Sequence, residues 1–511
     1  MLTNTLRLVM RASACRFALV VGTALIGLPC LAHADDQTKG AQIDDQTKSL
    51  QLKIDTLQHQ LDSMKDKIDS VKAAPTEDSA KILKRYMAGE TNLTMMGVTL
   101  YGTIDMGLSY QNHGAPLNDF LYLGSNEMLQ KNSTRTVWGM TPSGLSQSKV
   151  GLKFYEPVIE NQLNLVGKLE TGFNPQSGQL SDAVKSVQMN NGQSLYNQTA
   201  NADGSRAGQF FNSEAYVGVN SPTYGELVAG RVNDIFNDNV GMYDPMGGSY
   251  AFSPIGYSGF MAGAGNTENT RLNDALKYNV KVGPVRMTAL AQVNTYQNQS
   301  LGAYQFDVGT NAGGLSLDAA FSKINDSIHV GSTTVGCPTN TLGVSDCSYL
   351  NANVSDNTAE QLLAKYATGP VTGYLGYEHV NYANPSNAVP TGSSTIGGYL
   401  LHTNNAAFTN NQILNVFWTG AKYMISPKWS VTGAGYVELQ NDWSAHHCGS
   451  SSSCANGAGT AYWTSIMTDY NLTRRFDVYG GIMYNHYLGG LSNGYAYNSA
   501  YSPMVGGRFN F

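Results

Sequence analysis

The feature that most constrains the fold is an alternation of apolar and polar residues that begins after Gly97. Across Val98–Tyr110 the even positions hold Val, Leu, Gly, Ile, Met, Leu and Tyr, and the odd positions hold Thr, Tyr, Thr, Asp, Gly and Ser. A period of two puts these two sets on opposite faces of a β-strand. One face suits lipid and the other suits water, over enough residues for a tilted strand to cross a bilayer.

Less regular runs of the same kind recur as far as the C-terminus, and the joints between them alternate in length. Short joints include 221–223 and 282–284, and long ones include 174–209 and 233–270. Short turns that alternate with long loops are typical of an up-and-down transmembrane barrel. Examples of the runs are Lys149–Tyr155, Leu163–Gly172, Leu272–Val280, Val431–Leu439, Phe476–Tyr484 and Val505–Phe511.

The sequence therefore predicts an all-β fold, a transmembrane antiparallel β-barrel over 97–511. We count sixteen strands, with fourteen or eighteen as alternatives. A soluble sandwich would carry polar residues on its outward face, whereas one face of every clear run here is Val, Leu, Ile, Ala, Gly or Tyr. A barrel must pair its last strand with its first, so the terminal aromatic Phe511 predicts a closing strand and is a candidate assembly signal.

The composition fits this reading. Charged residues are 13% of the 511 residues, about half the usual share for a soluble globular protein. The one prominent apolar stretch, Phe17–Leu28, follows three arginines and precedes Ala32-His33-Ala34, which predicts a signal peptide over 1–34. After it no segment approaches the roughly 18 apolar residues of a membrane-spanning helix, so a membrane form of the mature chain must be a barrel.

Residues 35–74 differ from the rest because they contain no aromatic side chain and carry a heptad pattern. We expect a periplasmic coiled coil there, with a solitary amphipathic helix as the alternative, followed by a linker over 75–96. Ile at a and Leu at d usually favours dimers, so the symmetry of a trimeric barrel would have to override that preference. The a positions are Thr47, Ile54, Leu61 and Ile68, and the d positions are Ile43, Leu50, Leu57, Met64 and Val71.

Four cysteines remain once the signal is removed, and they fall as two close pairs, Cys337/Cys347 and Cys448/Cys454, in polar loop-like stretches. Secretion permits disulfides, so each pair is a candidate local bridge; unpaired loop cysteines are the alternative. His446-His447 beside Cys448 lacks metal-ligand spacing and reads as a polar loop. We therefore expect no metal and no cofactor.

Several stretches of the chain, in this order and spacing, resemble the general diffusion porins of β-proteobacteria over nearly all of 97–511. This resemblance implies a sixteen-stranded, trimeric outer-membrane barrel whose third loop, here 233–270, folds into the lumen. The coiled coil is not part of the usual family pattern, and neither are Ser213-Glu214 and Lys149, where the family has Arg-Gln and Arg. The stretches are Val98–Asp105, Ser148–Lys153, Leu169–Phe173, Phe211–Gly218 with Gly230-Arg231, Tyr470–Arg475 with Tyr479, and Gly507–Phe511.

The expected function is a water-filled channel through which small hydrophilic solutes and ions diffuse, filtered by width and charge at a constriction. Strand parity, the third loop and, for Arg231, the resemblance supply the candidate pore-lining residues. Acidic loop residues would face basic wall residues across the narrowing. The candidates are Tyr101, Asp105, Lys149, Lys153, Lys168, Glu170, Glu214, Arg231, Asp234, Asp238, Asp244, Glu268, Lys277 and Arg508.

The chain has a formal net charge of −6, which becomes −9 once the three signal arginines are removed. This balance argues against nucleic-acid binding and, with Glu214, predicts a weak preference for cations. No catalytic motif emerges, so we expect no enzyme activity. Expected partners are two further copies of the chain, outer-membrane lipid and lipopolysaccharide, and the barrel-assembly machinery. Two alternatives stay open: a substrate-specific channel, and a tether to peptidoglycan through the coiled coil.

Overall fold

The computed structural model divides the chain into two units, Met1–Ser79 and Ala80–Phe511, which are described separately. The structure describes residues 48, 51–59, 62, 92–114, 120, 134–190, 201–202, 205–256, 270–293, 302–331, 349–387, 393–396 and 398–511. In the first unit, residues 51–59 are helical, which agrees with the helix expected there and leaves its coiled-coil pairing a prediction. The signal peptide, Cys337, Cys347 and Glu268 lie outside the described residues.

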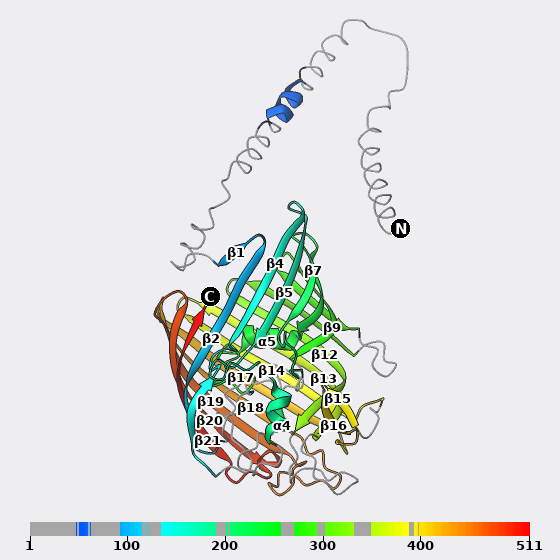
Figure 1. Cartoon of the computed structure of the whole chain (residues 1–511), viewed down its shortest axis with the longest axis vertical. Helices are drawn as coiled ribbons and strands as arrows, with labels where there is room; N and C mark the ends of the chain where they lie inside the picture. Colours follow the sequence, from blue (N-terminus) through cyan, green and yellow to red (C-terminus); the bar gives the residue numbers. More distant parts are fainter. Residues whose placement is uncertain are drawn as a thin grey trace. The chain divides into compact units, whose positions relative to one another are not determined.

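Sixteen strands of the second unit form a closed antiparallel barrel, as the sequence predicts (Figure 1). Each strand pairs with the next, and the last pairs with the first, so that Asp105 lies opposite Arg508. The backbone N–H of Phe511 also donates to the carbonyl of Gly102 at 3.0 Å. The sixteen are β2 (Val98–Gln111), β4 (Lys149–Ile159), β5 (Leu163–Gly172), β7 (Ala215–Ser221), β8 (Gly225–Asn233), β9 (Arg271–Val282), β10 (Val285–Gln292), β11 (Ala303–Ala312), β12 (Leu315–Gly331), β13 (Tyr349–Thr368), β14 (Val371–Ala383), β17 (Gln412–Ser426), β18 (Trp429–Gln440), β19 (Gly459–Asn471), β20 (Phe476–Gly489) and β21 (Ser499–Asn510).

Five short strands extend this barrel at its rims. One of them, β1, pairs with the start of β2 and falls inside the predicted linker 75–96. Another, β3, pairs with the far half of β2, whose near half pairs with β4. β6 and β16 extend the long hairpin β12–β13 at the end of the long loops. The five are β1 (Leu93–Met95), β3 (Val137–Pro142), β6 (Asn201–Ala202), β15 (Ser393–Ile396) and β16 (Tyr399–Asn404).

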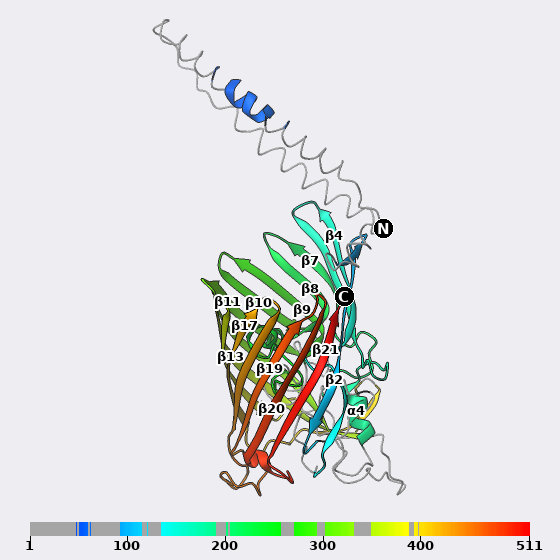
Figure 2. The same ribbon diagram turned by 90° about the vertical axis from the view of Figure 1, so that its left-hand side faces the viewer.

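The short turns lie at one end of the barrel, and their sequences explain their geometry. Gly313 and Gly314, which join β11 to β12, have φ of 57° and 86°. A two-residue hairpin needs positive φ at such positions, and glycine adopts it without a steric penalty. The long loops lie at the opposite end, where α4 (Ala183–Asn190) is also found (Figure 2).

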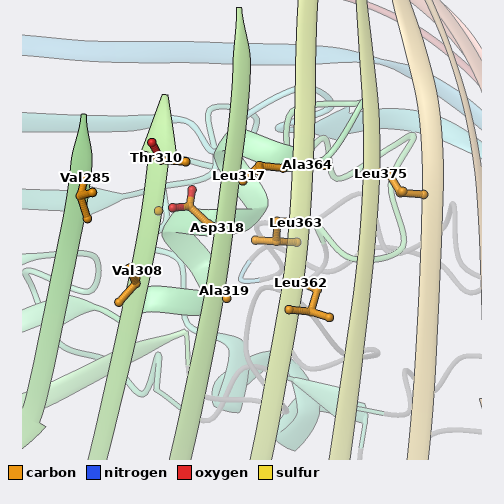
Figure 3. Close-up of a pocket in the computed structure, with 11 residues that line it drawn as sticks. Val285, Val308, Thr310, Leu317, Asp318, Ala319, Leu362, Leu363, Ala364 and Leu375 are labelled. Carbon is orange, nitrogen blue, oxygen red and sulfur yellow. The ribbon is translucent and has the colours of Figure 1, made fainter. Parts of the chain in front are cut away.

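Alternation along the strands separates an outer apolar face from the interior. Leu108, Leu362 and Leu375 point outward and are 55–61% exposed. A depression of about 570 Å³ in this wall crosses β10–β14 and is lined mainly by aliphatic side chains (Figure 3). Its most exposed lining residues, Val308, Leu362 and Leu375, lie on the lipid-facing side of the wall. None of the described helices is long and apolar enough to cross a membrane.

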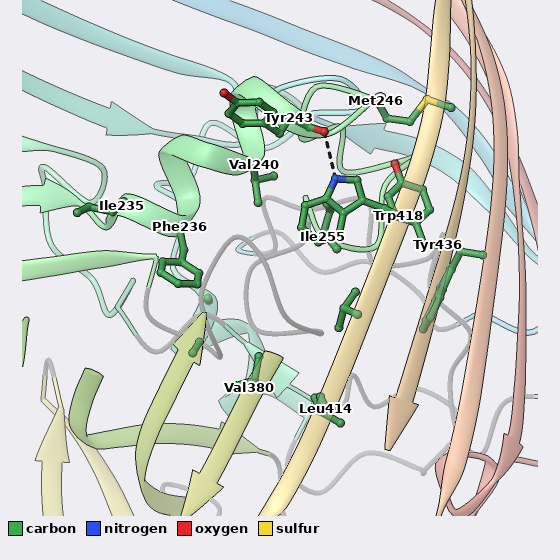
Figure 4. Packing of buried hydrophobic residues seen from close by; sticks show 14 of the residues in the cluster. Ile235, Phe236, Val240, Tyr243, Met246, Ile255, Val380, Leu414, Trp418 and Tyr436 are labelled. Carbon is green, nitrogen blue, oxygen red and sulfur yellow. Dashed lines mark hydrogen bonds between the residues drawn. The ribbon is translucent and has the colours of Figure 1, made fainter. Parts of the chain in front are cut away.

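The inner face carries polar residues, as expected, but part of it is apolar and buried. Of the predicted constriction loop, 233–270, the structure describes 233–256 and 270, and the described part lies inside the barrel and carries α5 (Ile235–Tyr243). The apolar side of α5 packs on the inner wall formed by β11–β14 and β17, where Val380, Leu414 and Trp418 are buried (Figure 4). The reason is physical: a loop folded into a wet lumen holds its position only if it buries apolar surface of its own.

Candidate constriction site

The start of the constriction loop is fixed by Asp234, which caps α5. Its carboxylate accepts a hydrogen bond from the backbone N–H of Asn237 at 2.6 Å, the usual interaction of a helix N-cap. The next backbone N–H, that of Ile235, donates to Oε1 of Gln305 on β11 at 2.8 Å. Asp234 is completely buried, so the structure gives this predicted pore-lining carboxylate a role inside the loop.

Asp244, at the end of α5, also has a role within the loop. It accepts hydrogen bonds from the hydroxyl of Tyr436 on β18 at 2.5 Å and from the backbone N–H of Gly248 at 2.7 Å. Burial raises the pKa of both Asp234 and Asp244, and the hydrogen bonds that each accepts oppose that rise. Neither carboxyl group presents a charge to the pore, in contrast to the sequence-based expectation.

Between these caps, Tyr243 joins the loop to two parts of the wall. Its carbonyl accepts a hydrogen bond from Nε1 of Trp418 at 3.1 Å. Its hydroxyl donates to Asp318, which also forms an ion pair with Arg286 at 2.7 Å. Arg286, Asp318 and Trp418 were not among the predicted site residues, because what makes them important is a contact with a loop distant in sequence.

Asp238 is the predicted loop carboxylate that does reach the interior space. It forms an ion pair with Lys277 of β9, and its side chain is 43% exposed. The same Lys277 ammonium donates to the carbonyl of Asn233 at 2.9 Å. This pair therefore joins the middle of α5 to the wall beside the start of the loop.

Predicted residues from β2, β4 and β5 meet around one carboxylate, Glu170. Its Oε2 lies 3.1 Å from Nζ of Lys149 and 3.5 Å from Nζ of Lys168, and it accepts the hydroxyl of Tyr101 at 2.7 Å. Lys168 also forms an ion pair with Glu214, next to β7. We call Tyr101, Lys149, Lys168, Glu170 and Glu214 the wall cluster.

Two further predicted cations flank the wall cluster. Nζ of Lys153 lies 4.7 Å from the ring centroid of Tyr101, within cation–π range. Arg231 on β8 is buried and donates to the carbonyls of Asn212 at 2.7 Å and Ser213 at 2.9 Å. Arg231 therefore holds the chain next to Glu214.

The remaining two predicted residues lie where β2 meets the C-terminal strands. Asp105 is buried and accepts backbone N–H groups of Leu145 at 2.9 Å and Ser146 at 2.8 Å, together with the hydroxyl of Tyr479 at 2.6 Å. It fixes the segment between β3 and β4. Arg508 forms an ion pair with Asp477, its register partner on β20, at 2.5 Å.

The interior ion pairs share an asymmetry of exposure. The basic side chain is 32% exposed against 3% for the acid in Lys149–Glu170, 26% against 0% in Arg286–Asp318, and 25% against 3% in Arg508–Asp477. In the Lys277–Asp238 pair the acidic side chain is the more exposed, at 43% against 7% for the lysine. Among the described ion pairs of the interior, the charge nearest to water is thus mostly positive. No group of three or more potential metal ligands occurs within the described residues.

The long loops contain the predicted bridge between Cys448 and Cys454. It closes a small ring in the loop between β18 and β19. The carboxylate of Asp442 lies 2.9 Å from Nδ1 of His447 and accepts the backbone N–H of Gly449 at 2.6 Å. Both contacts join the start of this polar loop to its middle, and His446-His447 lies in such a loop, as the sequence indicates.

A closed sixteen-stranded barrel with a helix-bearing loop docked inside it and a charged wall beside that loop defines a barrel of the porin class. The sequence model described as Gram-negative porin matches residues 79–490, and the chain belongs to this family of the bacterial outer membrane. It is 27% identical over 253 residues to an outer membrane porin protein of Bordetella pertussis, a match that spans 43% of this chain and 57% of that relative.

Solved structures agree on the fold. The chain is similar to an anion-selective porin from Comamonas acidovorans, with a TM-score of 0.53 and 16% identity over 81% of this chain and 99% of the other. It is also similar to a loop-deletion mutant of OmpT, an outer membrane protein of Vibrio cholerae, with a TM-score of 0.50 and 14% identity over 81% and 99%. Identities this low establish the barrel alone.

Proposed function

We propose that this chain forms a water-filled channel for the passive diffusion of small hydrophilic solutes and ions across the outer membrane. The observation that carries the proposal is the placement of α5 inside the closed barrel, where Asp238 and Lys277 connect it to the wall beside the start of the loop. A docked loop narrows the barrel interior, and fixed charges at a narrowing filter permeating ions. Family membership supports the same reading.

Net charge predicts a channel that is weakly selective for cations. The exposed charges of the interior instead favour weak selectivity for anions. Glu214, on which that prediction relied, is neutralised by Lys168, and Glu170 is covered by two lysines. Lys149 is the most exposed charge of these pairs. Because buried pairs cancel at a distance, the exposed ammonium groups set the potential beside the wall cluster, while Asp238 is the exposed acid on the loop.

We expect chloride to permeate slightly faster than potassium, which the reversal potential across a planar bilayer in a KCl gradient measures. Lys149→Glu should move the reversal potential clearly toward cation preference. Lys281→Glu makes the same charge change at the short-turn end of β9 and should move it much less. If the unchanged protein is clearly selective for cations, the proposed anion preference is wrong. If it shows no conductance at all, the proposal of a channel is wrong.

We further propose a homotrimer whose coiled coil, 35–74, lies in the periplasm. The start of β2 lies at the end of the barrel that carries the short turns, which in such barrels faces the periplasm. The chain before β2 would therefore emerge there and could contact peptidoglycan. Deleting 35–74 tests this role. If the segment tethers the barrel to the cell wall, conductance should be unchanged and cell-wall association should be lost. If the segment assists assembly, fewer trimers should form.

A further inference from the structure

A carboxylate without a described partner lies on the inner wall, close to the docked loop. Glu438 on β18 shares its face with Tyr436, the residue that holds Asp244. It lies one inward position nearer to the long loops and is only 6% exposed. With the described residues, the Glu438 carboxylate forms neither a hydrogen bond nor an ion pair. A buried carboxylate in this situation carries a large desolvation cost that a cation would offset.

The strand register gives Glu438 mainly apolar and aromatic neighbours. Val416 and Ala461 lie directly opposite it on β17 and β19, and Tyr487 lies opposite Ala461 on β20. Ala461 has only a methyl group, so no large side chain stands in that row between the carboxylate and the Tyr487 ring. No lysine or arginine occupies this row.

Three aromatic rings are packed together beside this carboxylate. Trp463 and Tyr487 meet edge to face with centroids 5.4 Å apart, and Tyr487 stacks on Tyr495 at 4.9 Å with an interplanar angle of 14°. Trp463 and Tyr487 are nearly completely buried. Aromatic faces attract ammonium groups, most strongly where water is excluded. The carboxylate and the neighbouring rings therefore both favour a ligand with an ammonium group.

We propose that Glu438, Trp463, Tyr487 and Tyr495, here called the Glu438 cluster, form a binding site for a small organic cation with a primary ammonium group. The ammonium would donate hydrogen bonds to the Glu438 carboxylate, and its alkyl chain would contact the rings. The proposal rests on the proposed function, because the cluster lies on the long-loop side of the constriction and would hold a solute before it reaches the loop.

Titration calorimetry of the full-length protein in detergent micelles tests the site, with n-butylammonium chloride as the probe and n-butanol as its neutral match. We expect butylammonium to bind more tightly than butanol. Glu438→Gln keeps the shape and removes the charge, and should weaken binding about tenfold. Trp463→Leu should weaken it by about threefold or more. Glu160→Gln, in the exposed turn between β4 and β5, should bind as the unchanged protein does.

Two results would overturn the site: equal binding of butylammonium and butanol, or equal affinity of Glu438→Gln and the unchanged protein. Tyr487→Leu tests the site without touching the carboxylate, should Glu438→Gln fail to fold. Block of the ion current by butylammonium is a second measurement. Glu438-dependent binding without any conductance would support the site and refute the diffusion channel, whereas conductance without such binding would refute the site alone.

Discussion

Replacing Trp418 with alanine is expected to release the constriction loop from the wall and to raise single-channel conductance severalfold. The indole is 2% exposed, and its Nε1–H donates to the carbonyl of Tyr243 at 3.1 Å. Truncation removes that bond and leaves a cavity under α5, at a cost of about 3–5 kcal/mol in the free energy of unfolding. Because the barrel strands do not depend on the loop for their ladder, the loosened element should be the loop.

Two matched variants separate packing from a general loss of stability. Trp418→Phe keeps a ring and loses the donor, so we expect an intermediate conductance and a cost of about 1–2 kcal/mol. Phe417→Ala truncates the adjacent residue, which points outward and is 44% exposed, and should leave conductance unchanged. Equal conductance of Trp418→Ala and the unchanged protein would show that Trp418 does not hold the loop.

Gly376 offers a second route to the same effect. It lies opposite Trp418 on β14, and a Cβ added there would lie 2.0 Å from Cε2 of the indole. Gly376→Ala should therefore displace the ring and raise conductance in the same direction as Trp418→Ala. Gly373→Ala, on the same strand with open space around its Cβ position, is the control. A conductance change of equal size in both glycine variants would point to the strand rather than to the ring.

Much of the fold could be predicted from the sequence because a barrel depends on local patterns. Alternation identifies strands and their faces, short and long joints identify the two ends, and the terminal strand identifies the closure. The same parity brought Tyr101, Lys149, Lys168 and Glu170 into one candidate set, and the structure places them within one cluster.

The interior could be predicted less well because it depends on contacts between distant segments. The acidic residues of the loop look alike in the sequence, yet Asp234 and Asp244 are buried in its internal structure while Asp238 is exposed. Asp318 and Trp418 gain their importance from Tyr243, which lies at least 75 residues away along the chain. Net charge carries no information on which member of an ion pair faces water, because that depends on how the two side chains are packed.

Replacing Lys168 with methionine is expected to be among the most destabilising changes in the wall cluster. Lys168 forms an ion pair with Glu214 and lies 3.5 Å from Glu170. Its side chain is 15% exposed, and those of Glu170 and Glu214 are 3% and 11% exposed. Methionine keeps most of the packing volume but leaves Glu214 buried without its cation, which costs about 3–5 kcal/mol.

A double variant shows whether that cost arises from charge. Lys168→Met combined with Glu214→Gln removes both members of the pair and should restore most of the lost stability, with a coupling of about 0.5–3 kcal/mol. Lys153→Met, which removes the cation–π contact with the Tyr101 ring, should cost less than about 1 kcal/mol. Denaturant unfolding followed by tryptophan fluorescence measures all three variants.

The selectivity of the same variants adds an independent measurement. Lys168→Met exposes the negative potential of Glu214 to the lumen, so its reversal potential in a KCl gradient should move toward cations. The double variant should return toward the unchanged protein. If Lys168→Met and the double variant are equally unstable and equally selective, the lysine acts through packing, and the wall cluster is not the charge filter proposed here. Rescue of both properties by Glu214→Gln would show that stability and selectivity depend on one ion pair. The Glu214 carboxylate needs a cation to be stable in the folded barrel, and Lys168 is also the cation that cancels its negative potential in the lumen.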